Sequence, residues 1–227
     1  MSAPASPSDR VNSAERLAAV QAGMARAARD ASRRDTPLLV AISKTFDADA
    51  IRPLIAAGQR HFGENRVQEA QGKWPALLAE TPGITLHLVG QLQSNKAADA
   101  VALFDVIHSV DRPSLVAALA KAQAAANKRP ACYLQVNIGD EAQKGGCPLA
   151  DLPALLDQAR SAGLNIIGLM CVPPADREPA PYFALLAEHA KRLGLPGLSM
   201  GMSSDFETAT LLGSTVVRVG SALFGKR

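Results

Sequence analysis

The stretch Leu38-Leu39-Val40-Ala41-Ile42-Ser43-Lys44-Thr45 is an unbroken apolar run that ends at a lysine. It is too short for a free-standing helix, and such a run is typical of a strand buried on both faces of a parallel sheet. A lysine at the carboxyl end of this strand points its amine toward the cavity that the sheet encloses. Because a buried ammonium is costly unless it is paired or deprotonated, Lys44 is a candidate functional residue. The alternative is a side chain that extends from the strand end into solvent.

Further apolar or β-branched runs follow along the rest of the chain, and they alternate with alanine-rich helical segments. A first helical pattern covers about 12–34, where Asn12 and Glu15 match a capping box. Eight predicted strands follow, at 38–43, 60–63, 85–89, 106–109, 132–138, 166–172, 198–202 and 216–219. Seven predicted helices separate them, at 47–57, 66–79, 95–104, 112–127, 149–162, 180–193 and 205–212.

Strict alternation of strands and helices predicts parallel strands joined by right-handed crossovers. Eight such units in about 190 residues predict an α/β fold, a single (β/α)8 TIM barrel with an extra N-terminal helix. A doubly wound open sheet is the alternative, but no GxGxxG sequence follows the first strand. The small, polar residues at 1–10 are expected to form a disordered N-terminus. Because no Pro/Ser/Gly-rich linker divides the rest of the chain, we expect one domain at 11–227.

Composition excludes several classes of function. Aromatic residues are 4% of the 227 residues, and the net charge of +3 is scattered, so we expect no nucleic-acid partner. Cys132, Cys147 and Cys171 are an odd number at irregular spacing, which fits reduced thiols in the cytoplasm better than disulfides or a metal site. No apolar signal core and no run of membrane-spanning length is present in the sequence, so we expect a cytoplasmic protein that does not contact membranes.

The ends of the last two strands predict an anion site, because the active site of such barrels lies at the carboxyl ends of the strands. Ser204 and Glu207 match a capping box, which places Ser203 and Ser204 at the amino terminus of a helix. Gly220 and Ser221 open a short terminal helix. Free backbone N–H groups and hydroxyls there would bind an anion, usually phosphate. The alternative is that the serines only cap helices.

Arg218, two positions before Gly220, is expected to point into the mouth of the barrel. Because arginine keeps its proton, it needs an acceptor, and the carboxylate of Asp205 is one candidate. A lysine amine, a phosphate site and an inward arginine together predict pyridoxal 5′-phosphate (PLP), bound to Lys44 as an imine. A Schiff-base aldolase that acts on sugar phosphates is the alternative.

Other polar residues are interpreted more simply. His87 lies in an apolar strand and is interpreted as a packed histidine rather than a base, and His61 and His108 likewise. His189 is expected at the surface, and Cys171 is interpreted as a small buried hydrophobic residue.

Eight motifs follow one another from the first predicted strand to the last: VAISKT at 40–45, HFGENRVQE at 61–69, HLVGQLQSNK at 87–96, HSVDR at 108–112, QVNIG at 135–139, GLMCV at 168–172, SMGMSSDFETA at 199–209 and VRVGSALFG at 217–225. Together they resemble the pyridoxal phosphate homeostasis protein family. The resemblance implies a PLP-bound (β/α)8 barrel similar to the N-terminal domain of alanine racemase. It also implies a role in intracellular PLP homeostasis, as a carrier or buffer of the cofactor.

The resemblance implies roles for individual residues. Lys44 matches the Schiff-base lysine, and Arg218 matches the residue that meets the pyridine nitrogen. The other cofactor-binding residues that it implies surround the phosphate and the ring: Ser203, Ser204, Gly220, Ser221, Asn65, Met170 and Met202.

Two considerations favour a binding protein over an enzyme. An arginine at the pyridine nitrogen donates a hydrogen bond, so it favours the unprotonated ring and weakens the electron sink. Racemisation needs an acid–base group on each face of the substrate, yet Tyr133 and Tyr182 are both expected away from the mouth. We therefore expect no catalytic residue, and a monomer that passes PLP to apo PLP-dependent enzymes. The alternative is a PLP-dependent amino-acid racemase.

Overall fold

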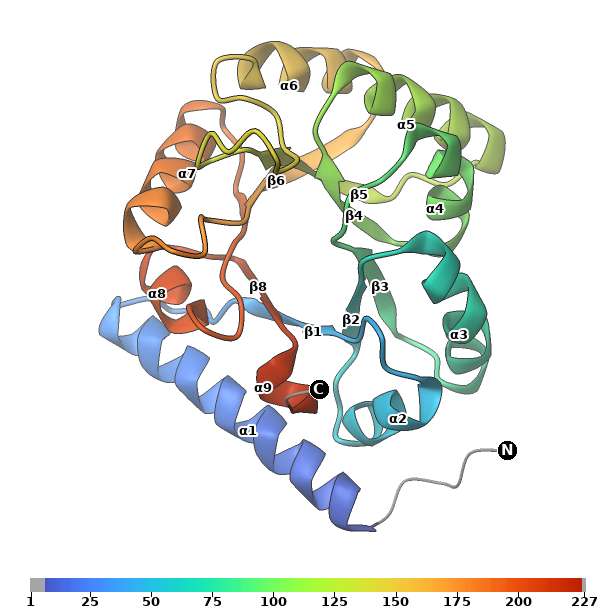
Figure 1. Cartoon of the computed structure of the whole chain (residues 1–227), viewed down its shortest axis with the longest axis vertical. Helices are drawn as coiled ribbons and strands as arrows, with labels where there is room; N and C mark the ends of the chain where they lie inside the picture. The colour runs from blue at the N-terminus through green and yellow to red at the C-terminus, as the bar shows by residue number, and fades with distance from the viewer. Residues whose placement is uncertain (1–6, 226–227) are drawn as a thin grey trace.

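Eight parallel strands close into a barrel in the computed structural model, which describes residues 7–225, with side chains from residue 13 onward. The strands follow one another around the barrel in chain order, and β8 pairs with β1. Figure 1 looks down this barrel and shows the helices as an outer ring. The predicted (β/α)8 barrel is therefore confirmed, and the open-sheet alternative is wrong.

The strands start within one residue of their predicted positions. They are β1 Leu38–Ile42, β2 His61–Glu64, β3 Thr85–Leu88, β4 Val106–Val110, β5 Ala131–Val136, β6 Asn165–Cys171, β7 Gly197–Ser199 and β8 Val216–Val219. β7 ends three residues before its predicted end, because Gly201 turns the chain away with a φ of +96°. A Cβ at Gly201 would lie 2.5 Å from the Cβ of Ala209, so this turn requires glycine.

The helices cover the outside of the barrel. They are α1 Pro7–Asp30, α2 Ala48–Ala56, α3 Val67–Glu80, α4 Ala97–Leu103, α5 Pro113–Ala126, α6 Leu152–Ser161, α7 Ala180–Arg192, α8 Phe206–Leu211 and α9 Ser221–Phe224, with a 3-10 turn, η1 Ser94–Lys96, before α4. In the described part of the chain, no helix combines the length and the apolar character that a membrane span needs.

The extra helix α1 packs against α2, α8 and α9, as Figure 1 shows. It begins at Pro7 rather than near Asn12, so the predicted capping box is not the start of the helix. Proline suits a first turn, because the N–H that it lacks has no partner there. Of the stretch 1–10 that is predicted to be disordered, 7–10 are helical and 1–6 lie outside the described residues.

The buried residues form an inner and an outer layer, because successive strand residues point to opposite faces. Val40 and Ile42 of β1 lie inside the barrel, in a cluster with side chains of β5, β6 and β8. Leu39 and Ala41 point outward and pack in the larger cluster that joins the sheet to the helices. This explains why β1 reads as a continuous apolar run.

The pairing of β1 with β8 brings the residues that follow these two strands close together. Val40 lies opposite Arg218 in this parallel pair. Lys44 follows two residues after the end of β1, and Gly220 directly after the end of β8, so both come to the same rim of the barrel.

Candidate functional site

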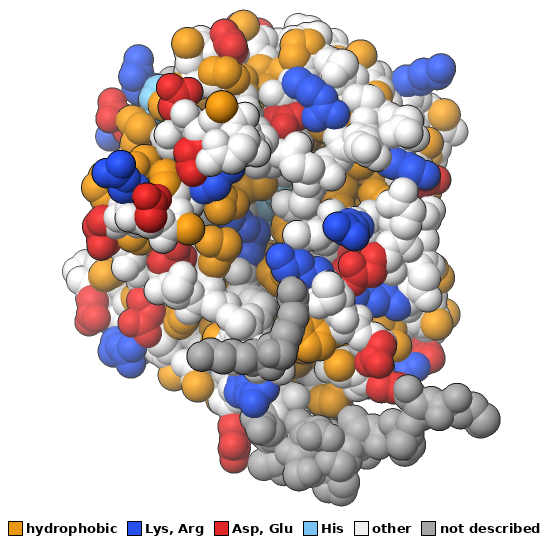
Figure 2. Space-filling model, in the orientation of Figure 1, with side chains coloured by type: hydrophobic (Ala, Val, Ile, Leu, Met, Phe, Trp, Pro, Cys, Tyr) orange, Lys and Arg blue, Asp and Glu red, His pale blue; other side chains and the backbone are white. Residues whose placement is uncertain are grey.

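A cavity of about 850 Å³ opens at the carboxyl ends of the strands. Eight of the nine predicted cofactor-binding residues line it: Lys44, Asn65, Met202, Ser203, Ser204, Arg218, Gly220 and Ser221. Figure 2 shows the molecule from the same side as Figure 1, with a hollow near its centre and Lys and Arg side chains at the border. A cavity of this volume is large enough for a small-molecule cofactor.

Met170 is the ninth predicted residue, and it does not line the cavity. It is buried inside the barrel with Val40, Ile42, Tyr133 and Val216. Along this chain segment the inward positions alternate, and the next one, Val172, is the residue that reaches the cavity wall. Met170 therefore belongs to the layer beneath the cavity.

Five further lining residues are absent from the sequence prediction: Ile42, Phe46, Val89, Val172 and Gly225. The ring of Phe46 stacks on Phe224 of α9, with centroids 4.5 Å apart and an interplanar angle of 15°. Val89 and Val172 lie two residues after inward-facing strand residues, so the alternation of side chains along the strands could have predicted that they face the cavity. Phe46 lies on a loop, where no such periodicity applies.

Lys44 is half-buried on the turn that follows β1. Its neighbour Thr45 has a φ of +67°, a left-handed conformation that costs a residue other than glycine roughly 1–2 kcal/mol. The Phe46 N–H donates to the Ser43 carbonyl at 3.1 Å, and the Thr45 N–H donates to the carboxylate of Glu69. The turn is thus held from outside, and it presents a primary amine to the cavity that can condense with an aldehyde.

Arg218 is buried, with 5% of its surface exposed, and it reaches the cavity from β8. Its Nη1 donates to the carbonyl of Ser199 at 2.6 Å and to the hydroxyl of Ser199 at 2.7 Å, and its Nη2 donates to the carbonyl of Cys171 at 2.9 Å. All three acceptors are neutral. None of the hydrogen-bond acceptors of Arg218 among the described residues is a carboxylate, so the Asp205 alternative is wrong; Asp205 instead accepts from the Met202 N–H at 2.5 Å. A buried cation of this kind suits a ligand that brings an acceptor.

Three histidine rings continue inward from Ser199 through the barrel. The Ser199 hydroxyl lies 2.8 Å from His108 Nδ1, His108 Nε2 lies 2.9 Å from His87 Nδ1, and His87 Nε2 lies 3.1 Å from His61 Nδ1. Burial lowers the pKa of all three rings, that of His87 to about 3, so they are neutral at pH 7. The interpretation as packed histidines is confirmed for His87 and His108, which are buried, whereas His61 is half-buried.

The loops after β7 and β8 are joined by one hydroxyl. Ser203 Oγ accepts from the N–H groups of Gly220 at 3.1 Å and Ala222 at 3.4 Å. Both N–H groups belong to the start of α9, where a helix leaves its first donors without partners inside the helix. Because Ser203 Oγ already accepts from these two N–H groups, an anion bound here would accept from the Ser203 and Ser221 hydroxyls, or from the N–H groups after it displaces the Ser203 side chain.

The capping box predicted at Ser204 and Glu207 is wrong. The residue before α8 is Asp205, whose side chain makes no cap hydrogen bond, and Ser204 is exposed. Glu207 instead pairs with Arg26 of α1 at 2.6 Å. Glu207 thus forms an ion pair with α1 and takes no part in a capping box of α8.

The remaining candidates lie away from the cavity. Cys132, Cys147 and Cys171 are free and buried, and burial raises the pKa of their thiols to about 12, 11 and 12, respectively. Tyr133 is buried inside the barrel, where its ring stacks on His108 at 4.6 Å, and neither Tyr133 nor Tyr182 lines the cavity. Within residues 7–225 no group of His, Cys, Asp or Glu is arranged to hold a metal ion.

Comparison with known proteins identifies relatives along nearly the whole chain. The model of the alanine racemase N-terminal domain matches residues 16–227. The pyridoxal phosphate homeostasis protein of Pseudomonas aeruginosa is 42% identical over 221 residues, which cover 94% of this chain and 95% of that protein. The Escherichia coli K12 protein of the same name is 38% identical over 200 residues, which cover 83% of this chain and 85% of that protein.

Solved structures agree in fold. The structure of PipY from Synechococcus elongatus with PLP bound has a TM-score of 0.82 and 42% identity, and the match covers 94% of this chain and all of that one. A histidine racemase from Leuconostoc mesenteroides, 16% identical with a TM-score of 0.71, shares the fold over 96% of this chain and 58% of its own. The chain therefore belongs to the family of the alanine racemase N-terminal domain and, within it, to the pyridoxal phosphate homeostasis proteins.

Proposed function

We propose that this chain binds PLP in the cavity at the carboxyl ends of its strands and acts in intracellular PLP homeostasis. The observation that carries the proposal is that the Lys44 amine and the buried Arg218 guanidinium line one cavity. Arg218 has neutral acceptors in the described structure, so a ring nitrogen with a lone pair would complete its contacts. The PLP-bound structure of PipY, a relative at 42% identity, supports the proposal.

Lys44 supplies the covalent attachment. Its amine, in the neutral form, would add to the aldehyde carbon of PLP, and the loss of one water molecule would leave a C=N bond. PLP bound in this way supplies an electron sink for bonds at the α-carbon of an amine. Arg218 would donate to the ring nitrogen and favour the unprotonated ring, which weakens that sink.

The other predicted residues have proposed roles that follow from where they lie. Hydroxyls and N–H groups of the loops after β7 and β8 would bind the phosphate: Ser203, Ser204, Gly220 and Ser221. Asn65 and Met202 would contact the ring from the cavity wall, and Met170 would support it from the layer beneath. The whole segment 11–227 would then be one PLP-binding domain.

A carrier or buffer without strong catalytic activity fits these residues better than a racemase. The two tyrosines that could supply a second acid–base group lie away from the cavity, and the Pseudomonas aeruginosa and Escherichia coli relatives are named for homeostasis rather than for a reaction. We propose apo PLP-dependent enzymes as recipients of the cofactor, a monomeric state and a cytoplasmic location. Free, buried thiols support the last of these.

An absorbance titration with PLP tests the proposal. We expect the purified protein to be yellow, and borohydride reduction to fix PLP onto a peptide that contains Lys44. The Lys44→Ala variant should lose the covalent bond and keep weaker binding through the phosphate groups. Lys96→Ala is the matched control, because Lys96 lies on a different strand-end loop and pairs with Asp99. Protein that fails to take up PLP would refute the proposal, and Lys44-dependent deuterium exchange at Cα of L-alanine would favour the racemase.

A further inference from the structure

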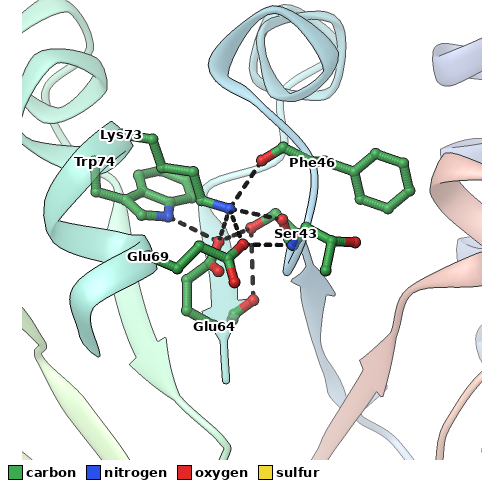
Figure 3. A network of polar contacts seen from close by, with 8 residues as sticks. Ser43, Phe46, Glu64, Glu69, Lys73 and Trp74 are labelled. Carbon is green, nitrogen blue, oxygen red and sulfur yellow. Dashed lines mark hydrogen bonds and ion pairs between the residues drawn. The ribbon is translucent and has the colours of Figure 1, made fainter. Parts of the chain in front are cut away.

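Directly behind the Lys44 turn lies a cluster of three ionisable side chains, Glu64, Glu69 and Lys73, which we call the Lys73 cluster. Glu64 ends β2, and the other two residues lie one helical turn apart on α3. Figure 3 shows the Lys73 ammonium at the centre of the cluster, between α3 and the chain that leaves β1. None of the three residues lines the cavity.

The Lys73 ammonium binds the main chain on both sides of Lys44. It donates to the carbonyl of Ser43, the residue before Lys44, at 2.9 Å, and to the carbonyl of Phe46, two residues after it, at 2.9 Å. Its other contacts are Glu69 Oε1 at 2.9 Å and Glu64 Oε1 at 3.0 Å. With 9% of its side chain exposed, Lys73 is nearly removed from solvent.

The two carboxylates bind other groups of the same turn. Glu69 accepts from the N–H of Thr45, the residue with the left-handed conformation. Glu64, which is fully buried, accepts from the Ser43 hydroxyl at 2.6 Å and from the Trp74 indole at 2.9 Å. Each residue that flanks Lys44 in the turn therefore has at least one polar group bound by the cluster.

This concentration of contacts is hard to explain by stability alone. Desolvation of buried charges offsets most of their mutual attraction, and apolar residues of similar volume often pack as well or better. A left-handed threonine, in turn, persists only where its surroundings determine the backbone. The cluster provides such surroundings, because its hydrogen bonds converge on Ser43, Thr45 and Phe46.

We infer that Glu64, Glu69 and Lys73 are positioning residues for Lys44: they hold the 43–46 turn in its left-handed conformation and thereby aim the Lys44 amine into the cavity. This inference rests on the proposed binding of PLP. The three side chains line no part of the cavity and act through the main chain of the turn, so their loss should impair covalent attachment at Lys44 while the rest of the cavity keeps its shape.

Two ligands separate these effects. PLP reports covalent bond formation through its absorbance, whereas pyridoxamine 5′-phosphate has no aldehyde and reports binding to the cavity alone. For Lys73→Met we expect the rate constant of covalent bond formation to fall by about tenfold to a hundredfold, the range that misplacement by an ångström produces. The dissociation constant of pyridoxamine 5′-phosphate should stay within about twofold.

A second substitution tests the turn itself. Glycine adopts a positive φ without a steric cost, so Thr45→Gly should make the conformation of the turn less dependent on the cluster. In the Lys73→Met background, Thr45→Gly should restore most of the lost rate. Glu69→Ala, at a side chain that is 28% exposed, removes the acceptor of the Thr45 N–H and should slow attachment severalfold. Glu80→Ala, on the same helix with 52% of its side chain exposed, is the matched control. It should change neither the rate of PLP attachment nor the dissociation constant of pyridoxamine 5′-phosphate.

The outcomes distinguish the two proposals. If the wild-type protein binds neither ligand, the proposed function fails. If it attaches PLP at Lys44 and Lys73→Met attaches it at the same rate, the inference fails. The inference would also be overturned if folded Lys73→Met lost PLP attachment and pyridoxamine 5′-phosphate binding equally, or if Thr45→Gly did not restore the rate of PLP attachment, because either result would indicate general structural damage. Should Lys73→Met not fold, Glu69→Ala decides by the same criteria, with folding checked by circular dichroism.

Discussion

Arg218 donates to the hydroxyl of Ser199 at 2.7 Å, and that hydroxyl is also the end of the histidine chain that crosses the barrel. Because Arg218 occupies a lone pair of Ser199 Oγ, the hydroxyl hydrogen is available for His108 Nδ1. Each neutral ring then accepts on Nδ1 and donates from Nε2, as far as His61. The only charge in this row is the guanidinium at the cavity. The interior of the barrel thereby holds Arg218 with neutral groups and leaves its charge for the ligand.

Ser199→Ala should show what this arrangement contributes. The change removes one acceptor of a buried guanidinium and the partner of His108, so we expect a loss of about 1–3 kcal/mol in the free energy of unfolding. Urea denaturation measures the loss. Ser161→Ala, at an exposed serine at the end of α6, should stay within about 0.5 kcal/mol of the wild type. Equal stability of the two variants would contradict a role for Ser199 in holding Arg218.

The histidine chain predicts sensitivity to acid. Burial lowers the pKa values of the three rings below their ordinary value of 6.5, and the pKa of His87 is about 3. Groups with a lowered pKa of this kind contribute stability that is fully present above pH 6.5 and is lost as pH falls toward the folded-state values. His87→Gln removes one such group, so its free energy of unfolding should decrease less than that of the wild type between pH 6.5 and 5. Parallel pH profiles in urea denaturation would show that His87 does not titrate with unfolding.

Much of the barrel could be predicted because its determinants are local. The apolar run at 38–43 and its seven counterparts specify buried parallel strands, and counting them gives the fold. Lys44, Ser203 and Arg218 could be placed at one rim because all carboxyl ends of a parallel barrel meet there. Position along a strand was enough information for these residues.

The features that escaped prediction depend on contacts between distant segments. His61, His87 and His108 come from three strands, and only the register of the closed barrel shows that their rings touch. Glu207 looks like part of a local capping box but pairs with Arg26, which is far away in sequence. The hydrogen bonds from Lys73 to the carbonyls of Ser43 and Phe46 could not be predicted from the sequence, because no pattern of residue spacing indicates them.

Gly201→Ala should damage the fold next to the cavity. Gly201 has a φ of +96°, and an added Cβ would lie 2.5 Å from the Cβ of Ala209, so both strain and overlap oppose the change. We expect a loss of about 1–3 kcal/mol in the free energy of unfolding and weaker PLP binding, because Met202 and Ser203 follow directly. Gly72→Ala, within α3 and with no atom near the added Cβ, should instead stabilise by about 0.5–1 kcal/mol. Thermal denaturation of both variants checks this contrast, and a Gly201→Ala protein as stable as the wild type would contradict it.

Glu64→Gln should change how stability depends on pH. Burial is the largest influence on the Glu64 carboxyl and raises its pKa, against the opposing effects of Ser43, Trp74 and Lys73. A raised pKa means that the folded state holds this proton more tightly than the unfolded chain, where the ordinary value is 4.5. The corresponding stability is present below pH 4.5 and is lost as pH rises through the folded-state pKa. Glutamine cannot titrate, so relative to the wild type the variant should gain stability as pH increases from 4.5 to the folded-state pKa of Glu64 and should keep that gain at higher pH. Urea denaturation at several pH values measures this difference, and a constant offset between the two proteins would show that Glu64 stays ionised throughout because Lys73 dominates.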